Sequence, residues 1–317
     1  MGQMVGSCSK MEQVVGFRPI FDTIAQGVSE GTMPGRLIIC PTPIGNLGDM
    51  TQRALDALRS ADAVCAEDTR VGGKLLAAFD IQGKRVERLD ENLMAQRAEA
   101  ILERVRAGET IVYCTDAGMP GVSDPGLRLV RAARVADPPV AIEVLPGPTA
   151  VATAYVASGC TDAAFYFGGF FPRKAGERFE LLERLRGLDA ALIFYESPNR
   201  LVSALSSIRE VFPLRHMAVC RELTKLHEEI VRGPVADVHA VFAEREAGIK
   251  GEVVLVIDGP SAEECASDAA SALDRAAVRA AELAQLGARP KEIAKTLASE
   301  LGIPRNDAYD VALRAKK

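Results

Sequence analysis

The sequence has no apolar run long enough to cross a bilayer, and no basic stretch followed by a continuous apolar segment opens it. From these absences we expect a cytoplasmic protein with neither a secretory signal nor contact with a membrane. Of its 317 residues, 48% are hydrophobic and 26% are charged, which is typical of a globular chain with more than one domain. A formal net charge of -5 argues against a general nucleic-acid coating protein but leaves room for a local basic face.

Zinc-binding patterns are missing as well. The seven cysteines are widely spaced, no C-x-x-C pair occurs, and the histidines His216, His227 and His239 lack metal-ligand spacing with cysteine. We therefore expect reduced thiols in the core, no disulfides and no structural metal.

The common phosphate-binding glycine motifs are also absent. No G-x-x-x-x-G-K-S/T loop occurs, and Gly45 and Gly48, which follow the first expected strand, fall short of G-x-G-x-x-G. Glu67 lies about twenty residues further on and could imitate the ribose-binding acid of that motif. A dinucleotide-dependent oxidoreductase therefore stays open as an alternative.

What the sequence does contain is an alternation of short, β-branched apolar runs with stretches of helical periodicity, which is typical of βαβ units. The strands expected in the first half are 36–42, 63–67, 109–115 and 141–145. Strands follow one another more closely in the second half, which predicts a mixed sheet. They are expected at 165–170, 190–196, 216–222, 228–232 and 252–258.

These patterns predict an α/β protein with two domains and a helical appendage. Residues 1–34 form an N-terminal extension without a clear pattern, and residues 35–148 form a domain with a mostly parallel sheet. Residues 149–260 form a second α/β domain with a mixed sheet. The alanine-rich residues 261–317 contain no strand candidate and form the helical C-terminal region.

Four turns rich in glycine, proline and polar residues follow strands of the first half, at 41–49, 66–70, 115–126 and 146–150. Because the carboxyl ends of parallel strands share one edge of the sheet, where ligands bind, we expect the four turns to line one cleft. Each alone could be only a tight turn. Asp116 stands at a strand tip and is expected to meet a ligand hydroxyl or cation. Asp124, before Pro125, is expected to cap the next helix.

Dense charge follows two strands of the second half, in FYESPNRL and CRELTKLHEE. These ionisable groups cannot all be buried without partners. They form either a solvated network of salt bridges or the wall of a cleft, and their position at strand ends favours the wall. The groups are Glu196, Arg200, Arg221, Glu222, Lys225 and His227.

In this order along residues 36–258, the motifs resemble the ribosomal RNA small subunit methyltransferase I family, within the tetrapyrrole methylase superfamily. The matching segments are TPIGNLGD, AEDTR, DAGMPGVSDPG, PGPTA, FYESPNR, RELTKLHEE and GEVVLVI. Residues 289–313 are similar to the C-terminal region of that family. They also resemble a helix-turn-helix pair, which could bind RNA, dock on protein or only pack.

The resemblance implies S-adenosylmethionine-dependent methylation of the ribose 2'-hydroxyl of a cytidine in small-subunit (16S) rRNA. It also implies a two-domain tetrapyrrole-methylase-like fold with the cofactor in the cleft between the domains, and a homodimer. Carried over by position, the cofactor would contact Pro43, Asp116, Ala117, Gly118, Val122, Ser123, Thr149, Ala150, Tyr195, Leu223 and Glu252.

The sequence departs from the family at three positions and in one segment. Met119, Thr149 and Asn199 stand where the family usually has threonine, serine and histidine. LDENLMAQR, at 89–97, replaces a His-Asn-Glu motif in what we expect to be a loop.

Methyl transfer to a hydroxyl needs alignment, together with a base or a cation that stabilises the alkoxide. Candidate bases are Asp68, Glu196 and Glu222, and candidate cations are Arg70, Arg221 and Lys225. Our hypothesis is that Glu222 and Lys225 act nearest the acceptor. RNA phosphates are expected to meet basic residues of 170–232, such as Arg173 and Lys174, or of the C-terminal helices.

Two other functions remain open. A methylase of corrin or sirohaem precursors has the same fold, and fold alone does not select the acceptor. A ribosome-assembly factor without catalytic activity would keep a pocket of the same kind.

Overall fold

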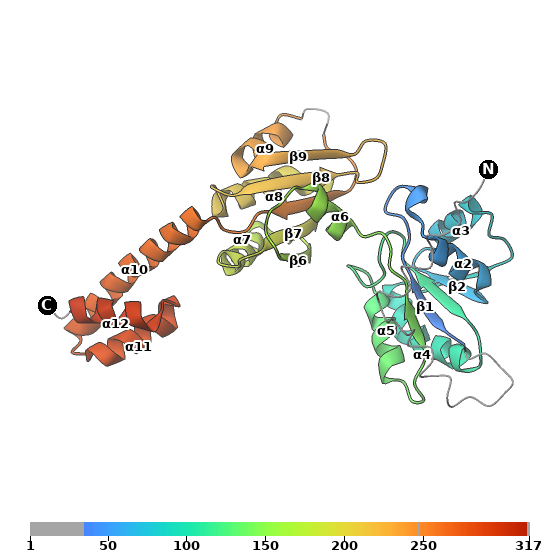
Figure 1. Ribbon diagram of the computed structural model, residues 1–317, viewed down its shortest axis with the longest axis horizontal. Helices are drawn as coiled ribbons and strands as arrows, with labels where there is room; N and C mark the ends of the chain where they lie inside the picture. The colour runs from blue at the N-terminus through green and yellow to red at the C-terminus, as the bar shows by residue number, and fades with distance from the viewer. Residues whose placement is uncertain (1–34, 246–247, 316–317) are drawn as a thin grey trace, which may run out of the picture.

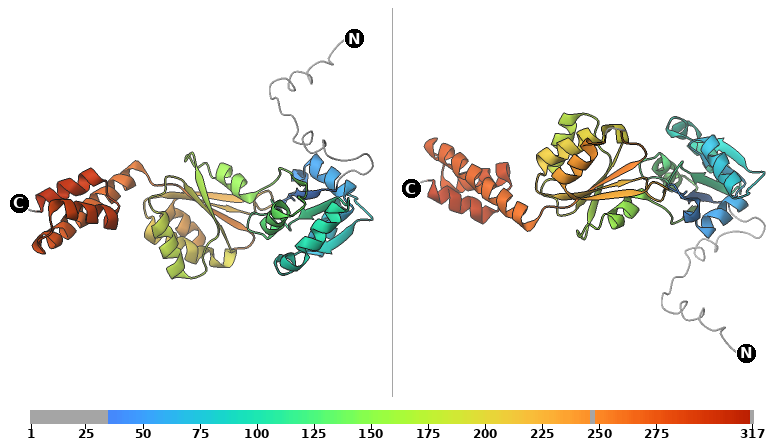
Figure 2. Two further views of the ribbon diagram at one scale, coloured as in Figure 1. Left: turned by 90° about the horizontal axis from the view of Figure 1, so that it is seen from below. Right: turned by 90° about the horizontal axis from the view of Figure 1, so that it is seen from above.

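The computed structural model describes residues 35–245 and 248–315 of the chain. Figure 1 shows two α/β units, each built on a five-stranded sheet, followed by a group of helices at the C-terminal end. The three parts follow one another along the long axis of the molecule in all three views (Figures 1 and 2). The expected N-terminal extension, residues 1–34, lies outside the described residues.

The first sheet is parallel throughout, in the order β3-β2-β4-β1-β5. Its strands are β1 (Leu37–Cys40), β2 (Ala63–Ala66), β3 (Arg85–Arg88), β4 (Ile111–Cys114) and β5 (Ile142–Val144). Strands β1, β2 and β4 are buried at every residue, as expected of central strands covered on both faces. Cys40 and Ala66 both pair with Cys114, so these three strands end level with one another.

Helices cover both faces of this sheet. On one face, α2 (Gln52–Ser60) and α3 (Thr69–Ala78) pack on apolar residues that include Ile38, Val64 and Val112. On the other, α4 (Glu91–Arg106) and α5 (Gly126–Val135) pack on residues that include Tyr113. The short 3-10 helix η2 (Leu47–Asp49) belongs to the loop after β1.

Two sequence predictions differ from the first unit. Strand β3 was not expected, because its RVER sequence has little apolar character; it is the half-exposed edge strand of the sheet. The predicted loop at 89–97 is wrong, since α4 begins at residue 91. The Asp90 carboxylate caps this helix by accepting hydrogen bonds from the amides of Asn92 and Leu93, and Met94 is buried against the sheet.

The second sheet is mixed, as predicted, in the order β6-β7-β10-β8-β9. Strands β6 and β7 are parallel and the other neighbours are antiparallel. The strands are β6 (Phe165–Phe170), β7 (Ala191–Glu196), β8 (His216–Arg221), β9 (Glu229–Pro234) and β10 (Val253–Ile257). The sequence prediction of an α/β protein with one mostly parallel and one mixed sheet is therefore confirmed.

Each face of the second sheet packs against different helices. The helices α7 (Ala175–Leu185), α8 (Leu201–Val211) and α9 (Val235–Ala243) form the larger apolar cluster on one face, with the 3-10 helix η3 (Pro198–Arg200) before α8. The other face carries α6 (Ala150–Ala157). Its apolar cluster includes Ile44 from the first unit, so this face is where the two units meet.

The C-terminal part consists of α10 (Ala262–Gln285), α11 (Pro290–Leu301) and α12 (Arg305–Arg314). It has an apolar cluster of its own, which includes Ile293, Leu297 and Ala308. Figure 1 shows α10 leading away from the second unit. Among the described helices, none combines the length and apolar character needed to cross a membrane.

An ion pair anchors α10 to the second unit. The Arg215 guanidinium donates to both carboxylate oxygens of Glu264 and lies 3.8 Å from the centre of the Phe212 ring. The two charged side chains are 1% and 9% exposed. We propose the three parts as domains with the boundaries predicted from the sequence, at 35–148, 149–260 and 261–317.

The described cysteines are free thiols. Cys40, Cys65, Cys114 and Cys220 are buried, which confirms their predicted place in the core. Cys160 is half-buried and Cys265 is exposed, so the prediction does not extend to these two.

Candidate functional site

The turns at the carboxyl edge of the first sheet are hydrogen bonded to one another. Thr42, after β1, and Gly118, after β4, exchange two backbone hydrogen bonds of 3.0 Å, and the Thr42 hydroxyl donates to the Thr115 carbonyl at 3.2 Å. The Asp68 amide, after β2, donates to Oδ1 of Asp116 at 3.1 Å. Three of the four turns predicted to share a cleft therefore form one connected edge.

A pocket of about 350 Å³ opens at this edge, between the loop after β1, helix α3 and the tip of β4. Pro43 and Asp116, both expected to contact the cofactor, line it together. Lys74 of α3 also lines the pocket, and nothing in the sequence pattern had singled it out.

The loop from 115 to 126 contains three residues with left-handed backbones. Gly118 and Gly121 have φ of 81° and 94°, and Ser123 has φ of 70°. A non-glycine residue in this region is strained, and such strain is concentrated at functional sites. The Asp124 carboxylate holds the loop by accepting hydrogen bonds of 2.8 Å from the amides of Gly121 and Gly126. Gly126 is the first residue of α5 and Pro125 is its N-cap, so Asp124 lies one residue before the cap position predicted for it, although its carboxylate accepts from the first amide of the helix.

Several expected cofactor contacts lie in one apolar cluster where the two units meet. Val122 comes from the loop, Ala150 from the start of α6, Tyr195 from β7 and Leu223 from the turn after β8. Buried core residues of the same cluster include Ile44 from the first unit. Thr149, the residue before α6, makes no side-chain cap, so its hydroxyl is not used to begin the helix.

The turn after β8 brings Glu222, Lys225 and Glu252 together. The Lys225 ammonium donates to Glu222 Oε1 and to Glu252 Oε2, both at 2.8 Å, and the Glu252 amide donates to the same Glu222 oxygen at 2.9 Å. Glu222 and Thr224 have left-handed backbones, with φ of 53° and 67°. This turn is strained in the same way as the loop that contains Ser123.

Lys225 also touches the first unit. A Cβ atom on Gly45 would lie 2.4 Å from Cγ of Lys225, so the glycine lets the lysine stem pass close to the loop after β1. The charged turn of the second unit is thereby in contact with the loop that contains Pro43.

The ion pairs determine the charge states in this turn. The hydrogen bond from Lys225 lowers the pKa of Glu222, which makes this carboxylate a weaker base. Burial lowers the pKa of Lys225, but its hydrogen bonds to Glu222 and Glu252 outweigh burial and leave the pKa raised. The structure therefore favours Lys225 as a fixed cation over Glu222 as a proton acceptor.

Asp68 and Arg70 form an exposed pair, with 2.6 Å between Oδ2 and Nη2. Asp68 also caps α3 by accepting from the Arg70 amide at 2.8 Å. The Arg70 side chain holds the pKa of Asp68 well below its usual range. Asp68 is therefore a weak base, and its connection to the site is the hydrogen bond from its amide to Asp116.

Glu67 is a residue whose chemistry the sequence did not reveal. Burial, followed by the charges of Asp124 and Asp116, raises its pKa to about 7, and a hydrogen bond with Thr115 acts in the opposite direction. Nearby, the Tyr113 hydroxyl is fully buried, and no described residue is its hydrogen-bond partner. A carboxyl that titrates near neutrality suits proton transfer. The sequence signal that could have identified Glu67 was its position directly after β2, level with Thr115 after β4.

The charges of FYESPNR belong to a structural network. Glu196 is buried, with 2.5 Å between its Oε1 and Nη2 of Arg200, and 3.7 Å between its Oε2 and Nη2 of Arg178. Arg178 also donates to the Pro172 carbonyl at 2.7 Å. Arg221 is likewise paired, with 2.9 Å from its Nε to Glu229 Oε2. For these residues the network of ion pairs fits better than the wall of a cleft.

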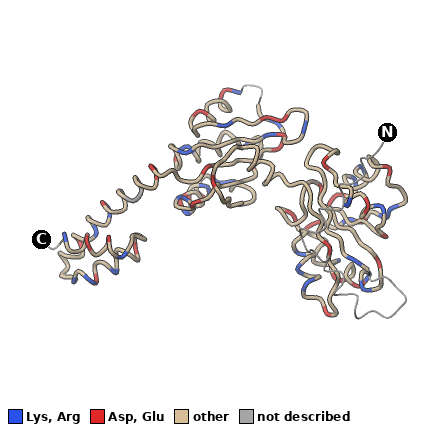
Figure 3. Tube along the Cα trace, viewed as in Figure 1, with Lys and Arg blue, Asp and Glu red and all other residues tan. Residues whose placement is uncertain are grey.

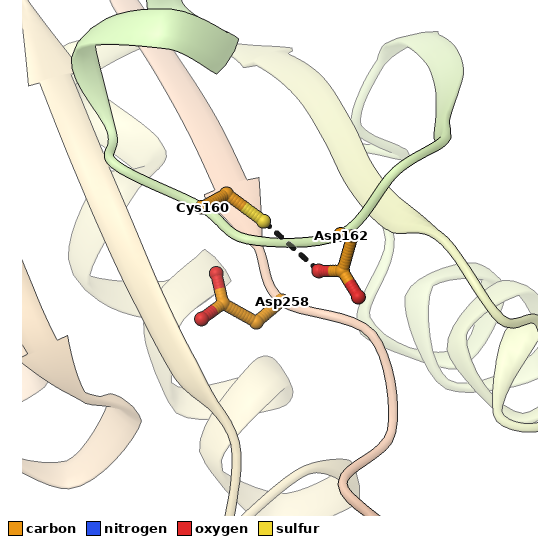
Figure 4. Close-up of side chains that lie close together, drawn as sticks. All are labelled: Cys160, Asp162 and Asp258. Atoms are coloured by element: carbon orange, nitrogen blue, oxygen red, sulfur yellow. Dashed lines mark hydrogen bonds between the residues drawn. The ribbon is translucent and has the colours of Figure 1, made fainter.

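Among the described residues, one group of three side chains is of the types that bind metal ions and is close enough to hold one. The group consists of Cys160, Asp162 and Asp258 (Figure 4). The Cys160 thiol donates to Asp162 Oδ2 at 2.9 Å, and Asp258 lies 2.6 Å from Nη2 of Arg232. Burial and the hydrogen bond with Asp162 raise the pKa of Cys160 to about 12, so it is held as a thiol. These partnered groups give no reason to assign a metal.

The sequence model of the family Tetrapyrrole (Corrin/Porphyrin) Methylases matches residues 36–239, which cover the first sheet and most of the second. The fold is thus that of a tetrapyrrole methylase. Solved structures agree on the fold alone. A crystal structure of diphthine synthase superposes with a TM-score of 0.56 and 14% sequence identity, and the match covers 71% of this chain and 91% of that protein. For the methyltransferase CobJ the TM-score is 0.54 and the sequence identity is 21%, and the match covers 71% of this chain and 100% of CobJ.

Several curated relatives carry the name ribosomal RNA small subunit methyltransferase I. The protein of Halalkalibacterium halodurans is 40% identical over 87% of this chain and 94% of its own. The protein of Bacillus subtilis is 38% identical, and the match covers 87% of this chain and 93% of that protein. The protein of Mycobacterium bovis is also 38% identical, over 89% of this chain and 96% of its own length. The chain therefore belongs to the ribosomal RNA small subunit methyltransferase I family of tetrapyrrole methylases, as the sequence motifs indicated.

Proposed function

We propose that this protein transfers a methyl group from S-adenosylmethionine to the ribose 2'-hydroxyl of a cytidine in small-subunit rRNA. The observation that carries the proposal is the gathering of Val122, Ala150, Tyr195 and Leu223 in one apolar cluster beside the Thr42–Gly118 bridge. The shared name of the curated relatives supports rRNA as the substrate.

The residues present fit the cofactor. The apolar cluster suits the adenine ring, and the glycine at 118 leaves no side chain between the loop and Ile44, since a Cβ there would lie 3.2 Å from Cγ2 of Ile44. Asp116 uses one carboxylate oxygen for the Asp68 amide and keeps lone pairs for a hydroxyl or ammonium group. Pro43, Ala117, Ser123, Thr149 and Glu252 remain our proposal for further cofactor contacts.

When bound, S-adenosylmethionine supplies an electrophilic methyl group on a sulfonium. What the chain supplies is alignment of the acceptor oxygen and control of its proton. We assign Lys225 to stabilise the developing alkoxide or a neighbouring phosphate, because its two carboxylate partners keep it protonated. In this proposal Glu222 holds Lys225 in place, and the Asp68–Arg70 pair borders the site.

The test is methyl transfer from labelled S-adenosylmethionine to purified small ribosomal subunits, preceded by calorimetric titration with the cofactor. We expect binding, followed by label in a cytidine ribose of the rRNA. Absence of binding would leave an assembly factor without catalytic activity as the better description. Transfer to a corrin or sirohaem precursor alone would overturn rRNA as the substrate.

The assignment to Glu222 and Lys225 has its own test. We expect alanine at both positions to slow methylation of the subunits while the chain stays folded. An unchanged rate would show that other residues act nearest the acceptor. We also propose that the protein is a homodimer in the cytoplasm. Light scattering of the purified protein tests whether it is a dimer.

A further inference from the structure

The edge strand β6 contains a bulge that changes the face on which its last residue lies. Phe167 pairs with Ile193 and Phe170 pairs with Tyr195, so β6 advances three residues while β7 advances two. Without the extra residue, Phe167 and Phe170 would point to opposite faces of the sheet. The bulge puts both on the face that carries Tyr195.

The bulge depends on two glycines. A Cβ atom on Gly168 would lie 2.2 Å from the Phe194 ring, and Gly169 has a left-handed backbone with φ of 70°. A Cβ on Gly169 would also come within 3.8 Å of the Ser123 hydroxyl. The bulge therefore lies against the loop that we propose for the cofactor.

Phe170 is exposed in this position. The residue is 63% exposed, although the centre of its ring lies only 5.5 Å from the ring centre of the half-buried Tyr195. Phe167 completes the group, with 5.0 Å between its ring centre and that of Tyr195. β6 is the outermost strand of its sheet, so no further strand of the described chain pairs along it. The result is an accessible aromatic ring beside the proposed cofactor loop.

Positive charge follows the exposed ring in the chain. Arg173 and Lys174 are both exposed, three and four residues beyond Phe170. Lys174 is paired with Glu177 at 2.9 Å, whereas within the described ranges Arg173 has no ion pair. Figure 3 shows acidic and basic residues interspersed in all three parts of the molecule, so the two cations that follow Phe170 in the sequence are a local feature and not part of a larger basic face.

We propose that Phe170 is a stacking platform for a nucleobase of the single-stranded RNA acceptor, and that Arg173 contacts a phosphate of the same strand. Proteins that read single-stranded RNA combine aromatic rings, on which unpaired bases stack, with cations along the backbone. The platform deepens the proposed function and rests on it, because it specifies how the acceptor nucleotide is held next to the cofactor loop.

The experiment compares Phe170→Ala with Phe165→Ala in the full-length protein. Phe165 lies on the same strand and is 44% exposed, but its ring packs on Tyr155 with 5.0 Å between ring centres. The measurements are the affinity for a labelled single-stranded RNA oligonucleotide, methyl transfer to small subunits, and the affinity for S-adenosylmethionine. We expect Phe170→Ala to weaken RNA binding by about 5-fold to about 150-fold, with cofactor affinity unchanged. Phe170→Trp should retain binding, and Phe165→Ala should match the parent.

Arg173 gives an independent measurement. Removing one phosphate contact by Arg173→Gln should reduce the slope of log affinity against log salt concentration by about 0.7, for any RNA sequence. An unchanged slope would remove Arg173 from the proposal.

Any one of the following results would overturn the platform. RNA affinity of Phe170→Ala equal to that of the parent, or equally lowered in Phe165→Ala, would show that the ring does not stack on a base. Loss of cofactor affinity would assign the ring to adenine, and conversion of a dimer to a monomer would assign it to a contact between copies. If the parent methylates subunits normally and Phe170→Ala does too, only the platform fails. If the parent neither binds RNA nor methylates, the proposed function fails as well.

Discussion

Replacing Gly118 with alanine adds one methyl group at the point where two loops of the site are hydrogen bonded. Gly118 has φ of 81°, and the new Cβ atom would lie 3.2 Å from Cγ2 of Ile44 and 3.7 Å from the Pro148 carbonyl oxygen. An L-residue in the left-handed region costs about 1–2 kcal/mol. The contact with Ile44 requires in addition that the isoleucine side chain shift by a few tenths of an ångström.

This strain must appear in one of two measurements. If the variant loop keeps its conformation, the free energy of unfolding falls by about 1–2 kcal/mol. If the loop relaxes in the free protein and the cofactor selects the original conformation, the same energy appears as a loss of about 5- to 30-fold in S-adenosylmethionine affinity. The two losses together should therefore amount to at least about 1–2 kcal/mol, because the shift of Ile44 adds to the backbone strain.

Urea unfolding and calorimetric titration measure the two losses, and Gly73→Ala is the matched control. Gly73 lies within α3, and a Cβ atom there has no neighbour within 4 Å among the residues that the structure describes. In a helix alanine is favoured over glycine by up to about 1 kcal/mol, so the control should be more stable, with unchanged affinity. The reasoning is refuted if Gly118→Ala matches the parent in both measurements, or if the control loses as much.

Three further predictions concern charge. Because burial and neighbouring carboxylates raise the pKa of Glu67 from 4.5 to about 7, the folded state retains a proton that the unfolded state releases, and stability falls as pH rises across this interval. Glu67→Gln should abolish that decline in urea unfolding measured from pH 4.5 to 8; identical slopes would contradict the raised pKa. Arg215→Ala should lower the free energy of unfolding by about 3–5 kcal/mol, because it leaves Glu264 buried without its partner. Arg279→Ala removes an exposed ion pair and should lower the free energy of unfolding by at most about 1 kcal/mol. Equal losses in the two variants would refute the argument that burial makes the Arg215–Glu264 pair the more important one. Lys225→Met should slow single-turnover methyl transfer by about 10²-fold, and a rate within about threefold of the parent would exclude the lysine from the reaction.

The elements that the sequence predicted well are those with strong local signals. The aromatic run at 165–170 was expected as a strand and is one from Phe165 to Phe170. RVER was missed because an edge strand with exposed charges has no apolar alternation. The helix start at Asp90 was missed although aspartate is a favoured cap, because residues 89–97 replace a His-Asn-Glu motif of the family that we had interpreted as a loop.

For the site, strand ends were the useful signal. In a parallel sheet the topology alone sends the residues after β1, β2 and β4 to one edge, so the approach of Asp116 to the turn after β2 followed from the order of motifs. The raised pKa of Glu67 did not follow, because it depends first on burial and then on the charge of Asp124, which is folded back by its hydrogen bonds to Gly121 and Gly126.

The sequence by itself determined the fold class, the family and the segments that meet at the sheet edge, because periodicity, glycine placement and motif order are local properties of the chain. Only the tertiary structure decided which charges are neutralised and which faces are open. Lys225 is held as a cation because the carboxylate of Glu252, twenty-seven residues away, accepts a hydrogen bond from it together with Glu222. Phe170 lies on the face of Tyr195 because a bulge breaks the alternation of its strand. Both depend on contacts between residues far apart in the sequence, where burial and electrostatic interactions are set by neighbours that no local pattern encodes.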